Sequence, residues 1–262
     1  MQRYRIRWTK VGRVRFVSAR DLSSVWERAL RRADLPIAYS EGFSPHAKVS
    51  FPDALPVGVS STGEYAELTF AAPIVPARDL AALSAALPEG MDITTYLEVP
   101  DGAPKLARML RATLWELEWP AVDADALTHV LTTRSRQLLD AEHAEVIRHR
   151  PDGDRVIDVR PAVLTLAAAI RSSPSGAAPT DAGGARTVLR AVLRNDGPTV
   201  RPTDLLTALA TDVASGTVRE PDVAPPVITT RVAQGETVDG GLREALSDEV
   251  VPLVLDVDAE AA

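Results

Sequence analysis

The chain contains no cysteine among its 262 residues. Disulfide bonds are therefore excluded, and a structural zinc site is disfavoured because cysteine is a principal ligand of such sites. An iron–sulfur cluster of the usual kind is excluded as well, since it needs thiolate ligands. The four histidines show no H-x-x-x-H spacing. We therefore expect neither a metal nor a cofactor in this chain.

Aromatic residues and long apolar runs are also scarce. Aromatic content is 5% and total hydrophobic content is 45%, so the core must consist mostly of Ala, Val and Leu. No apolar run approaches the roughly 18 residues of a membrane-spanning helix. The segment MQRYRIRWTK lacks the apolar stretch of a signal peptide. These absences predict a cytoplasmic protein with no membrane partner.

The net charge of −7 is unevenly distributed. Residues 1–50 contain eleven Lys and Arg against four acids, a surplus of +7, which leaves −14 for the other 212 residues. Such asymmetry suggests an anionic partner for the first part of the chain. A solvated charged surface without a ligand is the alternative, since basic faces are common on globular proteins.

Side-chain periodicity predicts strand, helix, strand, strand, helix and strand in the first half. Ser18 and Asp21 have the spacing of a capping box before a helix at 19–33. Its apolar face comprises Leu22, Val25, Trp26, Ala29 and Leu30; Arg20, Ser24, Arg28 and Arg31 lie opposite, with Arg32 at the flank. The remaining expected elements are strands at 3–10, 35–40, 47–51, 64–70 and 91–99 and a helix from Pro76 to about residue 87.

The second half repeats this order of elements. Strands are expected at 111–120, 186–195 and 227–234, helices at 123–139 and 203–213, and a hairpin turn at Pro151–Asp152–Gly153. The order predicts an α+β fold of two tandem ferredoxin-like (βαββαβ) units. We expect domains at 1–103 and 104–234, a disordered loop at 172–185 and an acidic tail at 235–262. Within that tail, EVVPLVLDV has the character of a sheet-edge segment, although a loose tail is favoured.

Motifs of the common catalytic classes are absent. The sequence has no G-x-S-x-G elbow and neither of the two common glycine-rich phosphate-binding patterns. His46 is the one histidine in an unusual setting, and Asp53 or Glu64 are candidates to orient it as a base. A loop histidine that makes a single backbone or phosphate contact is the better interpretation, because a lone histidine lacks a catalytic partner.

The Gly/Pro-rich stretch YSEGFSPHAK has a physical use in anion binding. Gly42 permits a positive φ, and Ser40 and Ser44 can bind phosphate oxygens. Tyr39 and Phe43 can stack on bases, or alternatively pack inward as anchors of a rigid loop. The candidate RNA- or phosphate-binding residues are Arg15, Arg20, Arg28, Arg31, Arg32, Tyr39, Ser40, Gly42, Phe43, Ser44, His46 and Lys48.

Residues 1–70 resemble the uncharacterised domain of radical-SAM-linked proteins in bacteria. The resemblance rests on Arg15-Phe16, Ser18, Asp21-Leu22, the segments 27–33 and 38–45, Leu55-Pro56, Gly58, Ser61 and Glu64-Tyr65. It implies an accessory or substrate-handling role beside a separate radical SAM protein, which would supply any radical chemistry. The chain departs from the pattern at Ala19, where the family usually has histidine. If that histidine were a catalytic base, its function would be lost or altered here.

Three functions follow from these observations. The first is a non-enzymatic module that binds or presents RNA through the 19–33 helix and the 39–48 loop. The second is a protein-interaction module that docks on the radical SAM partner through the same loop. The third is an RNA-acting enzyme that uses His46 as base, with Arg28 or Lys48 stabilising an oxyanion; Ala19 disfavours it.

Overall fold

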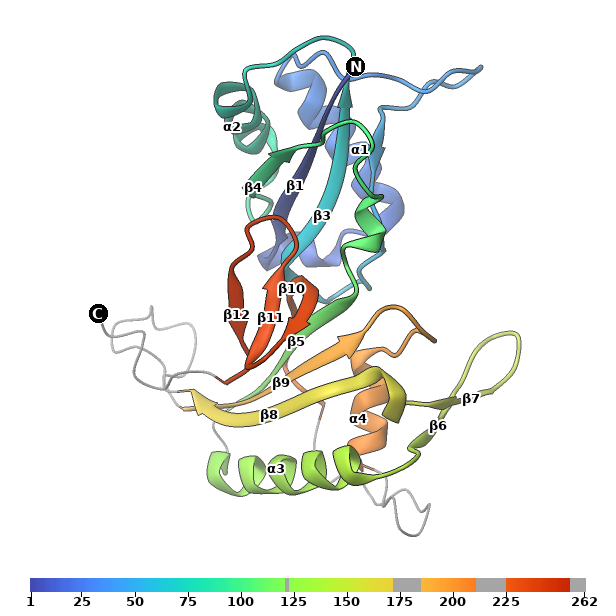
Figure 1. The fold of residues 1–262 in the computed structure, drawn as a ribbon, viewed down its shortest axis with the longest axis vertical. Coiled ribbons are helices and arrows are strands. Elements are labelled where there is room, and N and C mark those ends of the chain that lie inside the picture. The colour runs from blue at the N-terminus through green and yellow to red at the C-terminus, as the bar shows by residue number, and fades with distance from the viewer. Residues whose placement is uncertain (121–122, 172–184, 211–224, 255–262) are drawn as a thin grey trace. The chain divides into compact units, whose positions relative to one another are not determined.

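The computed structural model describes residues 1–120, 123–171, 185–210 and 225–254. The chain divides into two compact units. The first unit comprises 1–110, 231–235 and 244–249, and the second comprises 111–230, 236–243 and 250–262. Both combine strands and helices (Figure 1), so the predicted α+β class is confirmed. No helix in the described ranges is long and apolar enough to cross a membrane.

The first unit builds its sheet from β1 (Gln2–Lys10), β3 (Ser60–Phe70) and β4 (Ile93–Glu98) in the order β4-β1-β3. The short β2 (Val49–Ser50) pairs with the end of β3. Its helices are α1 (Ala19–Arg32) and α2 (Pro76–Ala86), with short 3-10 helices at Gly12–Phe16 and Leu106–Arg108. Residues 231–235 of β10 (Ile228–Val238) belong to this unit as well.

The core of the first unit forms where the apolar face of α1 meets β1. All five predicted apolar positions of α1 are buried, and so are alternate residues of β1. Trp8 and Trp26 pack edge to face with ring centroids 5.3 Å apart, and Phe51 contacts both rings. Ser18 accepts a hydrogen bond from the Asp21 N–H at 3.2 Å, which confirms the predicted capping interaction.

The second unit contains strands in the order β10-β5-β9-β8, with β10 represented by its residues outside 231–235. The elements are β5 (Ala112–Trp119), α3 (Ala124–Asp140), β8 (Val163–Arg171), β9 (Arg186–Arg194) and α4 (Pro202–Ala210). A 3-10 turn at Arg160–Ala162 precedes β8. The separate hairpin of β6 (Glu145–Arg148) and β7 (Arg155–Asp158) turns at Gly153, where φ is +114°, as predicted from Pro151–Asp152–Gly153.

Two predictions are wrong in this structure. Residues 35–40 form no continuous strand. Ile37 makes an isolated bridge with Phe70, and Tyr39 makes another with Ala47. The segment after 234 is not a loose tail throughout, since β11 (Gly241–Glu244) and β12 (Val250–Pro252) pair with each other, and β12 lies in EVVPLVLDV, the segment with the alternative sheet-edge prediction. Residues 172–184 of the predicted loop, 211–213 of the predicted helix and 255–262 of the tail lie outside the described residues.

Candidate functional site

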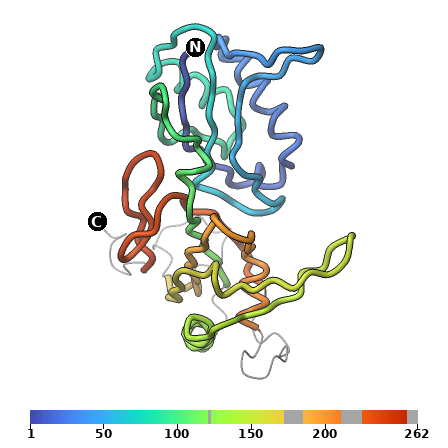
Figure 2. The backbone as a smooth tube through the Cα atoms, turned by 45° about the vertical axis from the view of Figure 1, so that its right-hand side comes forward, coloured from blue at the N-terminus to red at the C-terminus, as the bar shows by residue number. Residues whose placement is uncertain are grey.

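Residues 38–48 form a closed hairpin, which we call the 38–48 hairpin. The Lys48 N–H donates to the Ala38 carbonyl at 2.7 Å, and the Ser40 N–H donates to the His46 carbonyl at 2.8 Å. The Ser40 hydroxyl in turn accepts from the His46 N–H at 3.0 Å. Figures 1 and 2 show this blue hairpin projecting from the rest of the first unit.

The tip of the 38–48 hairpin is exposed and aromatic. The relative exposure of Phe43 is 110% and that of Tyr39 is 46%. Gly42 precedes Phe43 with φ at +125°, a backbone conformation that side-chain-bearing residues rarely adopt. The alternative that Phe43 anchors the loop by packing inward is therefore wrong. An aromatic ring held in water at a turn is available for stacking or for insertion into a partner.

One side of α1 lies next to the hairpin. His46 Nδ1 is 3.7 Å from Glu27 Oε1, and the Arg31 guanidinium on the next helical turn donates to the Glu27 carbonyl at 3.3 Å. Arg20, Arg28, Arg31 and Arg32 are all exposed, as the helical periodicity predicts. The structure thus brings His46 and Arg31 to the same part of the surface through Glu27.

The other predicted site residues differ in the contacts that they make. The Arg15 guanidinium stacks on Phe16, with its carbon 4.7 Å from the ring centroid. Arg32 donates to the Ala86 carbonyl of α2 at 3.4 Å. The backbone of Lys48 bonds to Ala38 and Thr69, and its side chain is half-buried. Ser44 is exposed beside Phe43.

Part of the basic surplus of residues 1–50 serves the first unit internally. The Arg3 and Arg5 guanidiniums bind the Glu67 carboxylate at 3.2 and 3.1 Å. Arg7 donates to the carbonyls of Thr62 and Val232, and Lys10 donates to the Val17 carbonyl. Seven of the eleven cations remain besides these four, and among the seven Arg15 and Arg32 make the contacts described above.

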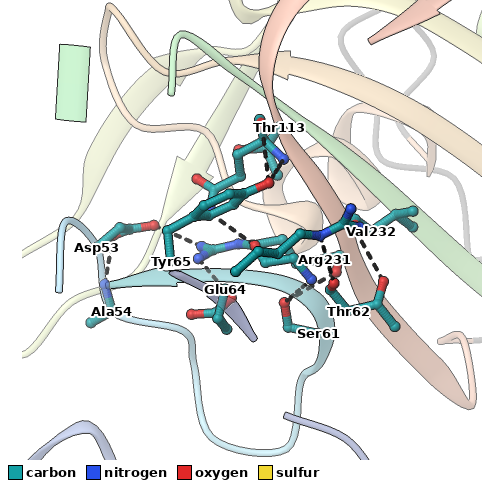
Figure 3. Close-up of polar contacts among 12 residues, drawn as sticks. Asp53, Ala54, Ser61, Thr62, Glu64, Tyr65, Thr113, Arg231 and Val232 are labelled. Atoms are coloured by element: carbon teal, nitrogen blue, oxygen red, sulfur yellow. Dashed lines mark hydrogen bonds and ion pairs between the residues drawn. The ribbon is translucent and has the colours of Figure 1, made fainter. Parts of the chain in front are cut away.

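A polar cluster in the same unit, buried except for the exposed Asp53, is called the Arg231 network here (Figure 3). Arg231 donates to Glu64 Oε1 at 3.1 Å and to Asp53 Oδ2 at 2.7 Å. The Ser61 hydroxyl donates to the Arg231 carbonyl at 3.1 Å. Gly63 permits the close approach of β3 to β10, since a Cβ at this position would meet the Val232 carbonyl oxygen at 2.6 Å.

Burial controls the titration of this network. Burial raises the pKa of the Glu64 carboxyl, and the neighbouring Arg231 guanidinium only partly opposes that effect. Burial also lowers the pKa of Lys10, which is 1% exposed. Tyr65 donates its hydroxyl to the Glu244 carboxylate, and burial first, then that carboxylate, raises the tyrosine pKa.

The Arg231 network corrects the sequence-based assignment of a partner for His46. Asp53 and Glu64 were candidates to orient His46, but both carboxylates bind Arg231. The network cross-links the 53–65 segment to residue 231 through one guanidinium shared by two carboxylates, so it supports the unit's architecture. In the described ranges, no three His, Asp or Glu side chains cluster as metal ligands would.

Ser61, Glu64 and Tyr65 are among the residues that carry the family resemblance, whereas the sequence alone did not predict a role for Arg231 or Glu244. An arginine at a buried position of an alternating strand was the available signal, because a buried guanidinium requires an acidic partner.

The chain matches the model of a known protein family. The family described as an uncharacterised protein conserved in bacteria (DUF2344) matches residues 3–202. No curated protein matches the chain.

Proposed function

The chain belongs to this uncharacterised bacterial family, and we propose that it is an accessory module that binds or presents RNA for a separate radical SAM protein. The observation that carries the proposal is the 38–48 hairpin, which holds Phe43 in solvent and brings His46 within 3.7 Å of Glu27 on α1, the helix that also carries the exposed arginines. Aromatic rings and guanidinium groups together are the elements with which proteins bind unpaired nucleotides.

The chemistry of this surface fits RNA better than a small anion. Phosphate alone needs cations and N–H donors, and a hydrated phenylalanine ring adds nothing to such a site. A base adds an apolar face of the size of that ring, and stacking on it is worth about 1–3 kcal/mol per base. His46 and Arg31, which both contact Glu27, are the groups that we propose for the phosphates that flank a stacked base.

The association with a radical SAM protein is proposed from the resemblance of residues 1–70. The absence of cysteine supports it, because a cluster-dependent reaction on RNA would then need a second protein. We propose a cytoplasmic location, because the protein would encounter its RNA there.

A tandem ferredoxin-like arrangement is part of the same proposal. In the first unit the order β4-β1-β3, with β2 next to β3, supports a βαββαβ unit. In the second unit the order β10-β5-β9-β8 supports another, with the β6–β7 hairpin inserted after α3. The fold itself carries little functional weight, since such units serve many activities.

Docking on the radical SAM partner is the second candidate, and the exposure of Phe43 favours it as well. Exposed aromatic rings are frequent anchors at the centre of protein interfaces. The third candidate, an RNA-acting enzyme based on His46, retains Glu27 as the nearby carboxylate. It would be excluded by an activity that survives His46→Ala.

Charge removal tests the RNA proposal. The variant Arg28→Ala/Arg31→Ala/Lys48→Ala and the matched variant Lys105→Ala/Arg108→Ala/Arg243→Ala each lose two arginines and one lysine. The matched residues are exposed and lie away from α1 in the sequence. We expect the first variant alone to lose affinity for a labelled single-stranded RNA. Equal affinity in both variants would contradict the proposed site.

A further inference from the structure

The sheet of the second unit ends at β8, one edge of which has no partner strand among the described residues. β8 is the last strand in the sheet order and, within the part of the chain that the structure describes, pairs only with β9. The pairing is regular from Thr165 to Arg171. Residues 163–170 contain neither proline nor charge. Natural proteins usually protect free edges with proline or charged side chains, so the described residues leave this edge available to a further strand.

A cavity of about 310 Å³ runs along this edge, and we call it the β8 edge groove. On one side it is lined by Thr132, Arg136 and Leu139 of α3, and on the other by Leu253 and Val254. Figure 1 shows β8 between β9 and α3.

The register shows that the groove reaches both faces of β8. Ala167 and Ala169 lie opposite Arg190 and Val188 of β9, and these residues line the groove together. Leu166 and Ala168 line it too, although alternate residues of a strand point to opposite faces. The groove therefore extends over both faces of the sheet at this edge. A strand added there would point its side chains alternately to the two sides of the groove.

The residues that line the groove indicate which side chains an occupant would carry. Its lining is mostly aliphatic, and the three alanines at 167–169 leave room for larger side chains of a partner. Arg136 is exposed at the groove and has no ion pair or hydrogen bond with any described residue. Arg190, by contrast, is bound by Glu116 and the Pro252 carbonyl at 2.8 and 2.6 Å.

We propose that the β8 edge groove binds an extended peptide segment of another protein by strand addition. The main chain of that segment pairs with β8, its alternating apolar side chains fill the two sides of the groove, and a carboxylate of the segment meets Arg136. Main-chain pairing supplies affinity in this mode, and the side-chain pockets supply specificity. This surface belongs to the second unit, so the proposal is independent of RNA binding at the 38–48 hairpin.

Peptide display on the full-length protein tests the proposal. A library of random nonapeptides is panned against the immobilised chain, and an enriched peptide is synthesised with a fluorescent label. We expect alternating apolar residues and at least one acid in the enriched sequences. Hydrogen exchange of the chain with the peptide bound should slow at the amides of 163–171 and leave the 38–48 hairpin unchanged.

Two charge reversals give the matched comparison. Arg136→Glu should weaken binding of the peptide by about tenfold, the usual scale for loss and reversal of one charge pair at an interface. Arg155→Glu changes the same charge at an exposed position of the β6–β7 hairpin and should leave the affinity unchanged. Failure of any peptide to enrich would overturn the proposal. So would exchange protection confined to another region, or equal affinity of the two variants.

Discussion

At the scale of single residues, Arg231 joins segments of the first unit that are far apart in the sequence. It binds Glu64 across 167 positions, and the two side chains are 4% and 6% exposed. Removal of one partner from a buried ion pair leaves an uncompensated charge. We expect Arg231→Leu to lower the free energy of unfolding by about 3–5 kcal/mol, measured by urea denaturation.

The double variant Arg231→Leu/Glu64→Leu is the control for that measurement. Replacing both charges with apolar side chains removes the desolvation penalty, so much of the lost stability should return. If the Arg231→Leu variant were at least as stable as the double variant, the buried Glu64 carboxylate would not need Arg231 to offset its charge.

His143 offers a second test, through its titration. Its Nδ1 lies 2.8 Å from Asp158 Oδ2, and this hydrogen bond raises the pKa of His143 above its ordinary 6.5. Because the folded pKa is the higher one, the bond stabilises the folded chain fully below pH 6.5 and is lost as pH rises through the raised value. NMR titration should show a raised pKa that returns toward 6.5 in Asp158→Asn.

The two aromatic residues of the 38–48 hairpin carry the stacking part of the RNA proposal. Phe43→Ala should weaken binding of single-stranded RNA by about 1–3 kcal/mol, the range for one stacked base. Tyr96→Ala is the matched control, since Tyr96 of β4 is also exposed, at 42%. Fluorescence anisotropy measures both variants. A loss of affinity as large in Tyr96→Ala would contradict specific stacking at the hairpin.

At the scale of elements, α1 depends on its first turn. Ser18 accepts from the Asp21 N–H, so its hydroxyl satisfies a donor that the helix leaves unpaired. Ser18→Ala should reduce the free energy of unfolding by about 1 kcal/mol. Ser23→Ala, at an exposed position inside α1, should cost far less. Thermal or urea unfolding separates the two, and an equal cost would show that the cap contributes nothing.

The elements differ in how well the sequence predicts them. α1 was predictable to within one residue because its cap, its apolar spacing and its exposed arginines all indicate the same helix. Residues 35–40 have the alternation of a strand but make only isolated bridges at Ile37 and Tyr39. β11 was missed, because its pairing depends on β12 and acidic composition suggested a loose tail; β12 lies in EVVPLVLDV, whose sheet-edge character was the less favoured alternative.

The residues of the candidate site also differ in how well the sequence predicts them. The exposure of Arg20, Arg28 and Arg31 follows from helical geometry, so one part of the surface could be predicted. The role of Arg231 could not be, because local periodicity indicates that a strand residue is buried but not which distant carboxylate it meets. The same holds for Glu27, which meets His46 only once the hairpin folds back to α1.

At the scale of the whole molecule, the distribution of charge restricts the kind of RNA binding that the chain can support. Four of the eleven cations in residues 1–50 are bound within the first unit, and the rest of the chain carries −14. Broad nonspecific binding of nucleic acid is therefore disfavoured, and a restricted RNA site on the first unit is the form that the account requires.

Salt dependence of RNA binding tests this account most directly. Binding of purified protein to total cellular RNA is measured across a salt series, for the wild type and for Arg28→Ala/Arg31→Ala/Lys48→Ala. Each phosphate contact on a single strand contributes about 0.7 to the slope of log K against log salt, so three lost contacts should make the slope shallower by about 2. Absence of binding at low salt, or identical slopes for the two proteins, would contradict RNA recognition by α1 and the 38–48 hairpin.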